Sequence, residues 1–216
     1  MVTSHQETHV EEIVNAITHG IGFALSAAGL WFLLQIFWDR PLAWLGAVLY
    51  GSTLTWLYLC SALYHACPRP ALGLKQRLQR LDHVAIFLFM AGSYTPFCLM
   101  ALPNPMGTYV LTAIWIGALL GSLYSLTVGT RFPTVSMLLY MIMGWMALFI
   151  LPYLLQALSF EAMAWMIAGA AAYMLGSVFF ATHWFRFSHA LWHVFVIAGS
   201  GCHYMCVWHT AQCCPY

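Results

Sequence analysis

Three histidines, an aspartate and a serine stand where long apolar stretches of the sequence begin or end. Ser61 and His65 lie four residues apart near the end of one stretch, Asp82 opens the next, and His189 and His193 open the last. Residues four apart point to the same side of a helix, so each pair can present two polar groups to one neighbour. An Asp at the centre of a membrane-spanning helix costs about 2.5 kcal/mol or more, so polar groups in such stretches are candidates for function.

This set of side chains predicts a zinc site. Three imidazoles with an open fourth position form a catalytic zinc site, whereas structural zinc usually has four protein ligands. We therefore expect His65, His189 and His193 to bind zinc. A water on such an ion has a pKa of about 7, and Asp82 could take its proton as general base. Ser61 could orient that water, hold Asp82 or donate to a developing oxyanion. Alternatively, the histidines form hydrogen bonds between helices or lie hydrated at the membrane surface.

Two further groups of polar residues accompany this set. Glu12, Asn15 and His19 follow one stripe of the first helix from the same end. They could support the zinc ligands through hydrogen bonds, although a structural hydrogen bond between helices is the alternative for His19. Near the other end of the last helix, a soft-metal site could be drawn from Cys202, His203, Cys206 and His209. No carboxylate or partner motif accompanies it, so we expect packing there. The terminal Cys213 and Cys214 are expected to be poorly ordered, and the alternative is that they are exposed and have a redox or metal-binding role.

The composition indicates which elements must position these residues. Hydrophobic residues make up 62% of the 216 residues, charged residues only 6%, and the mean hydropathy is +0.80. Soluble domains are roughly half apolar and a quarter charged, so the chain belongs in a membrane. Its net charge of +1 and its few charges leave no basic face for nucleic acid.

Apolar stretches between turn signals predict an all-α bundle of seven membrane-spanning helices. With roughly 20 apolar residues needed for each span, the chain has room for about seven and no soluble domain. The predicted spans are 13–38, 42–64, 84–102, 109–128, 134–154, 163–180 and 190–208. We expect a tail of residues 1–12, a membrane domain of residues 13–209 and a short tail of residues 210–216.

The loop charges predict the orientation of this bundle. Six of the seven Lys and Arg residues fall in the second, fourth and sixth loops, namely Arg69, Lys75, Arg77, Arg80, Arg131 and Arg186. Cytoplasmic loops collect positive charge, so we expect a cytoplasmic N-terminus, a C-terminus outside the cell and a multi-pass protein of the bacterial inner membrane. The helix ends that carry the three histidines then share the cytoplasmic side.

The same residues carry a resemblance to a known family. Four motifs occur in order along the chain: the stretch from Glu12 through Asn15 to His19, Ser61 with His65, Asp82 with the run to Phe97, and His189 with His193. In these motifs the sequence resembles the hemolysin III family, the bacterial branch of the progestin and adiponectin receptor family. The resemblance implies seven helices, a cytoplasmic N-terminus and zinc on His65, His189 and His193, with Ser61 and Asp82 alongside.

The wider superfamily includes alkaline ceramidases, so the resemblance also implies, by analogy, hydrolysis of a lipid amide bond. We therefore expect a zinc-dependent hydrolase of lipid amide or ester bonds, with a role in membrane-lipid homeostasis and membrane lipids as its substrates or ligands. One alternative is a non-catalytic membrane sensor or regulator in which zinc joins the helices. Another is a membrane-active cytolysin, which we rank lowest because the sequence is that of a resident bundle.

Overall fold

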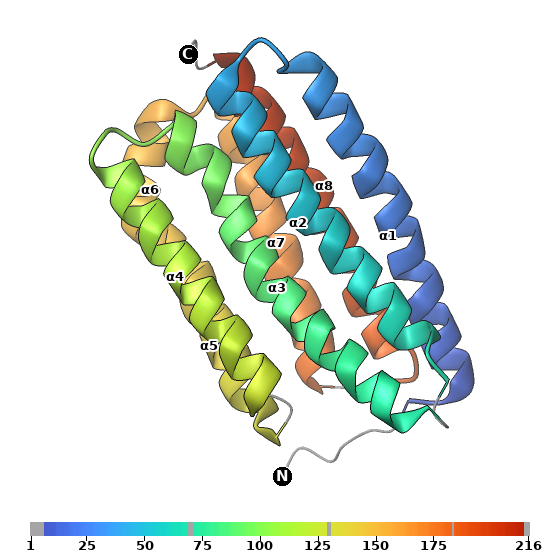
Figure 1. Ribbon diagram of the computed structural model, residues 1–216. Helices are drawn as coiled ribbons and strands as arrows, with labels where there is room; N and C mark the ends of the chain where they lie inside the picture. The colour runs from blue at the N-terminus through green and yellow to red at the C-terminus, as the bar shows by residue number, and fades with distance from the viewer. Residues whose placement is uncertain (1–6, 69–70, 129–130, 183, 214–216) are drawn as a thin grey trace.

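The computed structural model describes residues 7–68, 71–128, 131–182 and 184–213 (Figure 1). Within these ranges the chain is helical and contains no strand. The helices are α1 (His9–Ile36), α2 (Pro41–Ala66), α3 (Leu72–Met100), α4 (Met106–Thr127), α5 (Pro133–Trp145), α6 (Ala147–Ala157), α7 (Phe160–Thr182) and α8 (Ser188–Cys213). Arg69 of the second loop and the terminal Cys214 lie outside the described residues.

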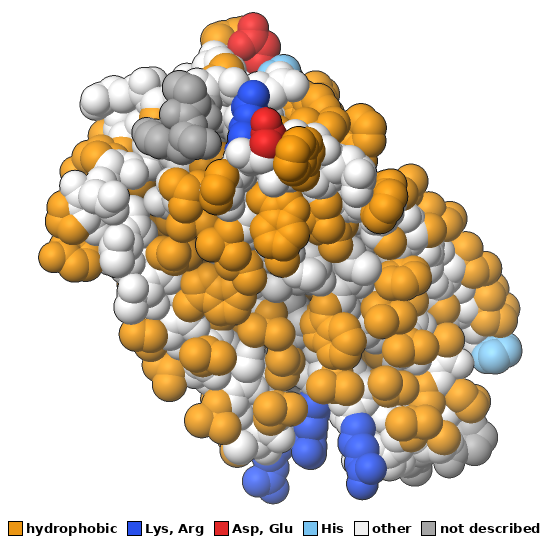
Figure 2. Space-filling model, turned by 45° about the horizontal axis from the view of Figure 1, so that its top comes forward, with side chains coloured by type: hydrophobic (Ala, Val, Ile, Leu, Met, Phe, Trp, Pro, Cys, Tyr) orange, Lys and Arg blue, Asp and Glu red, His pale blue; other side chains and the backbone are white. Residues whose placement is uncertain are grey.

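Seven segments of the described chain are long and apolar enough to span a membrane. The helices α5 and α6 form one of them, Thr134–Ala157, and each other helix supplies one. The predicted all-α fold with seven spans is therefore confirmed. In Figure 2 hydrophobic side chains cover the middle of the visible face, and most Lys and Arg side chains gather at one end of it. Such an apolar belt lets the surface face lipid.

The fifth span differs from the prediction because its helix is interrupted near Met146. The Tyr94 hydroxyl of α3 lies 2.9 Å from the carbonyl oxygens of both Met143 and Gly144, which share its single proton. In an unbroken helix those carbonyls would accept from the amides of residues one turn later. A side chain inserted into this hydrogen-bond ladder is a recognised cause of a helix break.

The first helix begins at His9, four residues before the predicted span. Thr8 is its N-cap, and the Glu11 amide donates to Thr8 Oγ1 over 3.4 Å. Glu11 Oε2 in turn accepts from the Thr8 amide over 2.8 Å. This reciprocal pair is a capping box, which satisfies two backbone donors that the first turn of a helix otherwise leaves free. The extra turn brings the polar residues before Ile13 into the helical bundle.

The helices that carry the candidate site pack together at one end of the bundle. In Figure 1, α1 and α8 begin, α2 ends and α3 begins at the lower end of the molecule. The helix α8 contacts α1, α2 and α3, and α1 also packs along α2. Gly22 permits this last approach, because a Cβ there would lie 2.7 Å from the ring of Tyr58. Small residues at such crossings let two membrane helices come close.

Candidate metal centre

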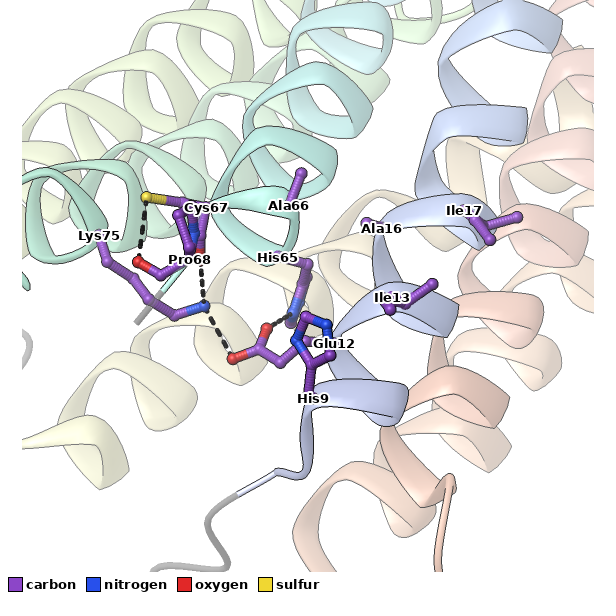
Figure 3. Close-up of a pocket in the computed structure, with 10 residues that line it drawn as sticks. All are labelled: His9, Glu12, Ile13, Ala16, Ile17, His65, Ala66, Cys67, Pro68 and Lys75. Carbon is purple, nitrogen blue, oxygen red and sulfur yellow. Dashed lines mark hydrogen bonds and ion pairs between the residues drawn. The ribbon is translucent and has the colours of Figure 1, made fainter. Parts of the chain in front are cut away.

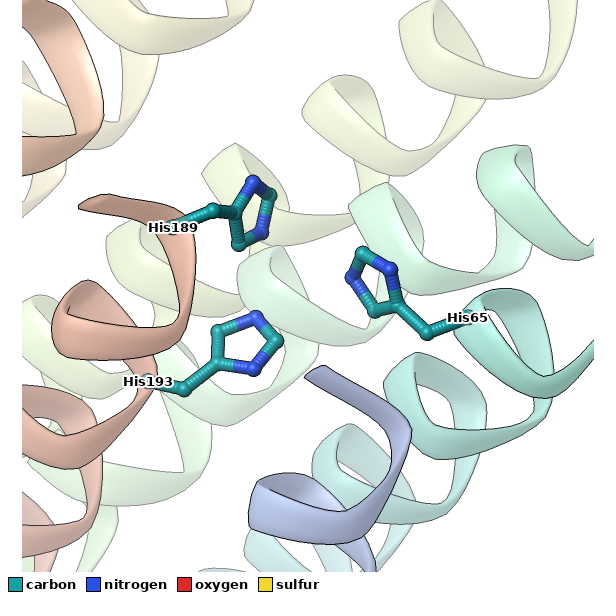
Figure 4. Close-up of side chains that lie close together, drawn as sticks. All are labelled: His65, His189 and His193. Carbon is teal, nitrogen blue, oxygen red and sulfur yellow. The ribbon is translucent and has the colours of Figure 1, made fainter. Parts of the chain in front are cut away.

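The side chains of His65, His189 and His193 converge between α2 and α8 (Figure 4). Each can offer a ring nitrogen such that the three nitrogens lie within 4.8 Å of one another. The ring centroid of His65 lies 5.0 Å from that of His189 and 5.1 Å from that of His193. His65 and His193 are buried, at 3% and 1% exposure, and His189 is partly buried. Two helices far apart in the sequence thus bring three imidazoles together.

Carboxylates hold two of these imidazoles at Nδ1. Glu12 Oε2 lies 2.9 Å from Nδ1 of His65, and Glu7 Oε1 lies 2.6 Å from Nδ1 of His189. An ionised carboxylate only accepts, so Nδ1 of each histidine carries a proton and donates it. The lone pair of each neutral ring is then at Nε2. Carboxylates commonly fix metal-binding histidines in this way.

A hydroxyl fixes the third imidazole. The Thr18 Oγ1 lies 3.1 Å from Nδ1 of His193. The Thr18 hydroxyl has carbonyl acceptors of its own on α1, at 3.0 Å on Val14 and 2.8 Å on Asn15. Because its single proton is directed to those carbonyls, the oxygen accepts from Nδ1 of His193. His193 therefore takes the same tautomer as the other two rings, with its lone pair at Nε2.

These features fit a metal ion that binds imidazole nitrogens, as zinc does. Nε2 of His65 is buried and has no hydrogen-bond partner among the described residues, which is costly for a polar atom unless a ligand completes it. The three nitrogens lie within 4.8 Å of one another, so side-chain rotation can bring each of them to about 2.0–2.1 Å from one ion. Among the described residues three imidazoles make up this group, and a metal ion held by three imidazoles has a position left for water.

Glu7, Glu12 and His65 form a second group whose possible ligand atoms also lie within 4.8 Å of one another. The two groups share His65, so they are parts of one centre. The carboxylates already have partners, because Glu12 Oε1 pairs with the Lys75 ammonium at 2.8 Å and Glu7 Oε2 accepts from the Asn15 amide at 2.9 Å. The imidazoles are therefore the candidate ligands, and the carboxylates orient their rings.

Asp82 and Ser61 lie beside this centre. Ser61 is buried, at 3% exposure, one turn before His65 on α2. Asp82 of α3 is within hydrogen-bonding reach of Ser61 and near enough to His189 for their charges to interact. The structure thus brings Ser61, His65, Asp82, His189 and His193 together from three helices.

The predicted supporting residues of α1 all face the centre, although they act differently. Glu12 orients His65 directly, and Asn15 acts through Glu7. The ring of His19 stacks on that of His193, with centroids 3.5 Å apart and planes 14° apart. Within the described part of the chain neither ring nitrogen of His19 has a hydrogen-bond partner. The interhelical hydrogen bond considered for His19 is therefore not seen, and the ring holds His193 by stacking.

Glu7 and Thr18 are the site residues that the sequence reasoning missed. Glu7 was assigned to a tail, yet its carboxylate reaches His189. Burial raises the pKa of the Glu7 carboxyl, but the hydrogen bond from His189 and the charges of His189 and His65 outweigh burial and hold the pKa below its usual value. Glu7 is therefore ionised at neutral pH. The pattern Thr8-x-x-Glu11 could have revealed it, because a capping box starts the helix there.

The turn before α8 ties that helix to α1. Phe187 has a φ of 68°, in the left-handed region that side chains other than glycine rarely adopt. Its amide donates to Glu11 Oε1 over 3.3 Å. The carboxylate that caps α1 thus also fixes the start of α8, whose first two turns carry His189 and His193. This contact sets the position of the two histidines along the bundle axis relative to Glu7.

Replacing Glu7 tests its orienting role. Glu7→Gln keeps the size of the side chain but removes the charge that holds the Nδ1 proton of His189. Loss of a group that orients a ligand weakens metal binding about 10–100-fold, and we expect an increase of this size in the zinc dissociation constant. Competition with a chromophoric chelator measures it. Glu161→Gln, which removes an exposed carboxylate at the start of α7, is the control. If the two variants had equal zinc dissociation constants, Glu7 would not have this orienting role.

The cysteines and histidines near the far end of α8 form no such cluster among the described residues. Cys206 is fully buried, and the ring of His203 stacks on Tyr173 with centroids 5.4 Å apart. Nδ1 of His203 has no hydrogen-bond partner within the described residues. Cys213 is exposed. Cys206 and the ring of His203 therefore pack within the bundle.

Comparison with known proteins identifies a family that matches most of the chain. The profile of the family described as Haemolysin-III related matches residues 7–204. Hemolysin-3 of Bacillus cereus is 38% identical over 200 residues, which cover 91% of this chain and 90% of that protein. The Hemolysin-3 homolog of Bacillus subtilis is 35% identical over 199 residues, covering 91% and 92%. The human Monocyte to macrophage differentiation factor is 25% identical over 215 residues, covering 94% and 86%.

Proposed function

The chain belongs to the Haemolysin-III related family, and from this membership and the geometry of its histidines we propose that it is a zinc-dependent lipid hydrolase of the bacterial inner membrane. Its substrates are membrane lipids with an amide- or ester-linked acyl chain, and its role is in membrane-lipid homeostasis. The observation that supports this most strongly is the shared orientation of the three rings, each held at Nδ1 with Nε2 left for a metal.

The ligands and their supports would work as follows. His65, His189 and His193 hold the zinc ion, and Glu12, Glu7 and Thr18 keep each ring in the binding tautomer. When bound, zinc supplies Lewis acidity and makes a water acidic near neutral pH. Asp82 accepts the proton of the attacking water and can pass it to the leaving amine or alcohol. Ser61 holds the Asp82 carboxylate in place and can donate to the oxyanion that develops on the lipid carbonyl.

A second candidate function is a membrane sensor or regulator in which zinc joins helices. The polar contacts that connect helices at this centre favour it. Glu7, just before α1, contacts His189 of α8, and Glu12 of α1 contacts both His65 of α2 and Lys75 of α3. Zinc at this junction would lock those helices together. A ligand that shifts them would then change the zinc affinity, and the reverse would hold by linkage.

A lipid assay separates these two functions. Purified protein is reconstituted in phosphatidylcholine vesicles, with zinc or after chelation, and given labelled ceramides, N-acyl amines and acyl esters. The hydrolase proposal expects fatty acid release that chelation abolishes and zinc restores. Matched melting curves serve as the control for folding. No release from any lipid, together with a melting temperature that rises with zinc, would reject the hydrolase and favour the regulator.

A further inference from the structure

A cavity of about 490 Å³ lies between α1 and the end of α2 and reaches the metal centre (Figure 3). Its lining includes His65 together with Glu12, the carboxylate that orients His65. Ligand sites in proteins commonly have volumes of about 300–1,000 Å³. We call this space the α1–α2 cavity. It is large enough for part of a lipid molecule and lies next to a zinc ligand.

One wall of the α1–α2 cavity continues onto the lipid-facing surface of α1. Ile13 and Ile17 line the cavity, yet their side chains are 44% and 57% exposed. Ile21 and Leu25 extend the same stripe at four-residue spacing, with exposures of 54% and 59%. In a membrane such exposed side chains face acyl chains. An acyl chain lying along this stripe can therefore enter the cavity from the bilayer without crossing water.

The polar wall of the α1–α2 cavity indicates the kind of lipid. The Lys75 ammonium is 2.8 Å from Glu12 Oε1 and also donates to the carbonyls of Tyr64 at 3.3 Å and Cys67 at 3.1 Å. An ammonium has three N–H donors, and all three have acceptors here. Lys75 is therefore not available to bind a phosphate. A polar group without charge, such as an amide with hydroxyls, can instead bond the free lone pairs of Glu12 and the exposed imidazole of His9.

From these features we propose that the α1–α2 cavity is the entrance through which an uncharged acyl-amide lipid passes from the inner leaflet to the metal centre. The acyl chain lies along Ile13 and Ile17, and the amide points toward His65. The proposal rests on the proposed function for the fate of the lipid, but the occupancy of the cavity can be tested without turnover.

Photo-crosslinking tests this entrance. Zinc-loaded protein in phosphatidylcholine vesicles receives a ceramide with a diazirine in its acyl chain, and adducts are mapped by mass spectrometry. We expect adducts on residues 13–17 and 66–68 in the wild type. Ala16→Trp places a ring in the cavity and should reduce those adducts about tenfold or more, since a tenfold loss needs only about 1.4 kcal/mol. Zinc content, measured on the same samples, should not change.

Matched variants make the result decisive. Leu120→Trp places the same ring at an exposed position of α4, outside both the stripe and the cavity lining, and should keep the adducts. Ala66→Trp fills the cavity from α2 and replaces Ala16→Trp if that variant loses zinc. Adducts that map elsewhere, or an equal loss of adducts in Leu120→Trp, would overturn the proposal. So would equal crosslinking by phosphatidylglycerol carrying the same diazirine chain. Adducts without hydrolysis of any lipid would reject the hydrolase and keep the entrance, whereas hydrolysis without these adducts would do the opposite.

Discussion

Purified His65→Ala is expected to lose bound zinc while the wild type retains one ion per chain. Apparent zinc binding in sites with four ligands is worth about 10–16 kcal/mol, or about 3 kcal/mol for each ligand, so loss of one ligand weakens binding more than about 100-fold. The substitution also leaves the Glu12 carboxylate without its partner on α2. Elemental analysis of protein washed with a weak chelator measures the effect.

The control for this prediction is His203→Ala, which removes another histidine from the interior of the bundle. His203 stacks on Tyr173 and belongs to no metal-binding group among the described residues. Its zinc content should equal that of the wild type. If His65→Ala kept a full equivalent of zinc in this wash, His65 would not be a ligand, and the centre would have to be assigned differently.

Asp82→Asn is expected to separate zinc binding from catalysis. The amide keeps the shape of the carboxyl group and its reach to Ser61, but it cannot accept a proton from water. Loss of a general base lowers turnover about 10²–10⁴-fold. Asp82 is not among the metal-binding groups, so the zinc content should stay near one equivalent. The measurement is the rate of fatty acid release from the lipid that the wild type cleaves fastest.

Ser61→Ala provides the comparison for Asp82→Asn. It removes the hydroxyl near Asp82 but leaves the carboxylate, so we expect a smaller loss of turnover than in Asp82→Asn, with zinc retained. Turnover of Asp82→Asn at the wild-type rate would exclude Asp82 as the base. Loss of zinc in Asp82→Asn would instead make the aspartate part of the metal-binding set.

The sequence by itself determined the fold class and the grouping of three histidines. Apolar length sets the number of spans because a helix must cross about 30 Å of hydrocarbon with its backbone groups paired internally. The seven spans and the family membership were predicted and are confirmed. The grouping of His65, His189 and His193 was also predictable, because the loop charges place the ends of their helices on one side of the membrane and polar groups in apolar helices seek one another.

Only the tertiary structure decided how these rings are held. The roles of Glu7 and Thr18 depend on where the turn before α8 meets the start of α1, a contact made by Phe187 and Glu11 across 176 positions of sequence. No local pattern specifies such a distance. Likewise, the spacing of His19 along its helix allowed a hydrogen bond between helices, but in the packed bundle its ring stacks on that of His193. Residue type and helical period give the side of a helix on which a group lies, whereas its partner depends on how whole helices pack.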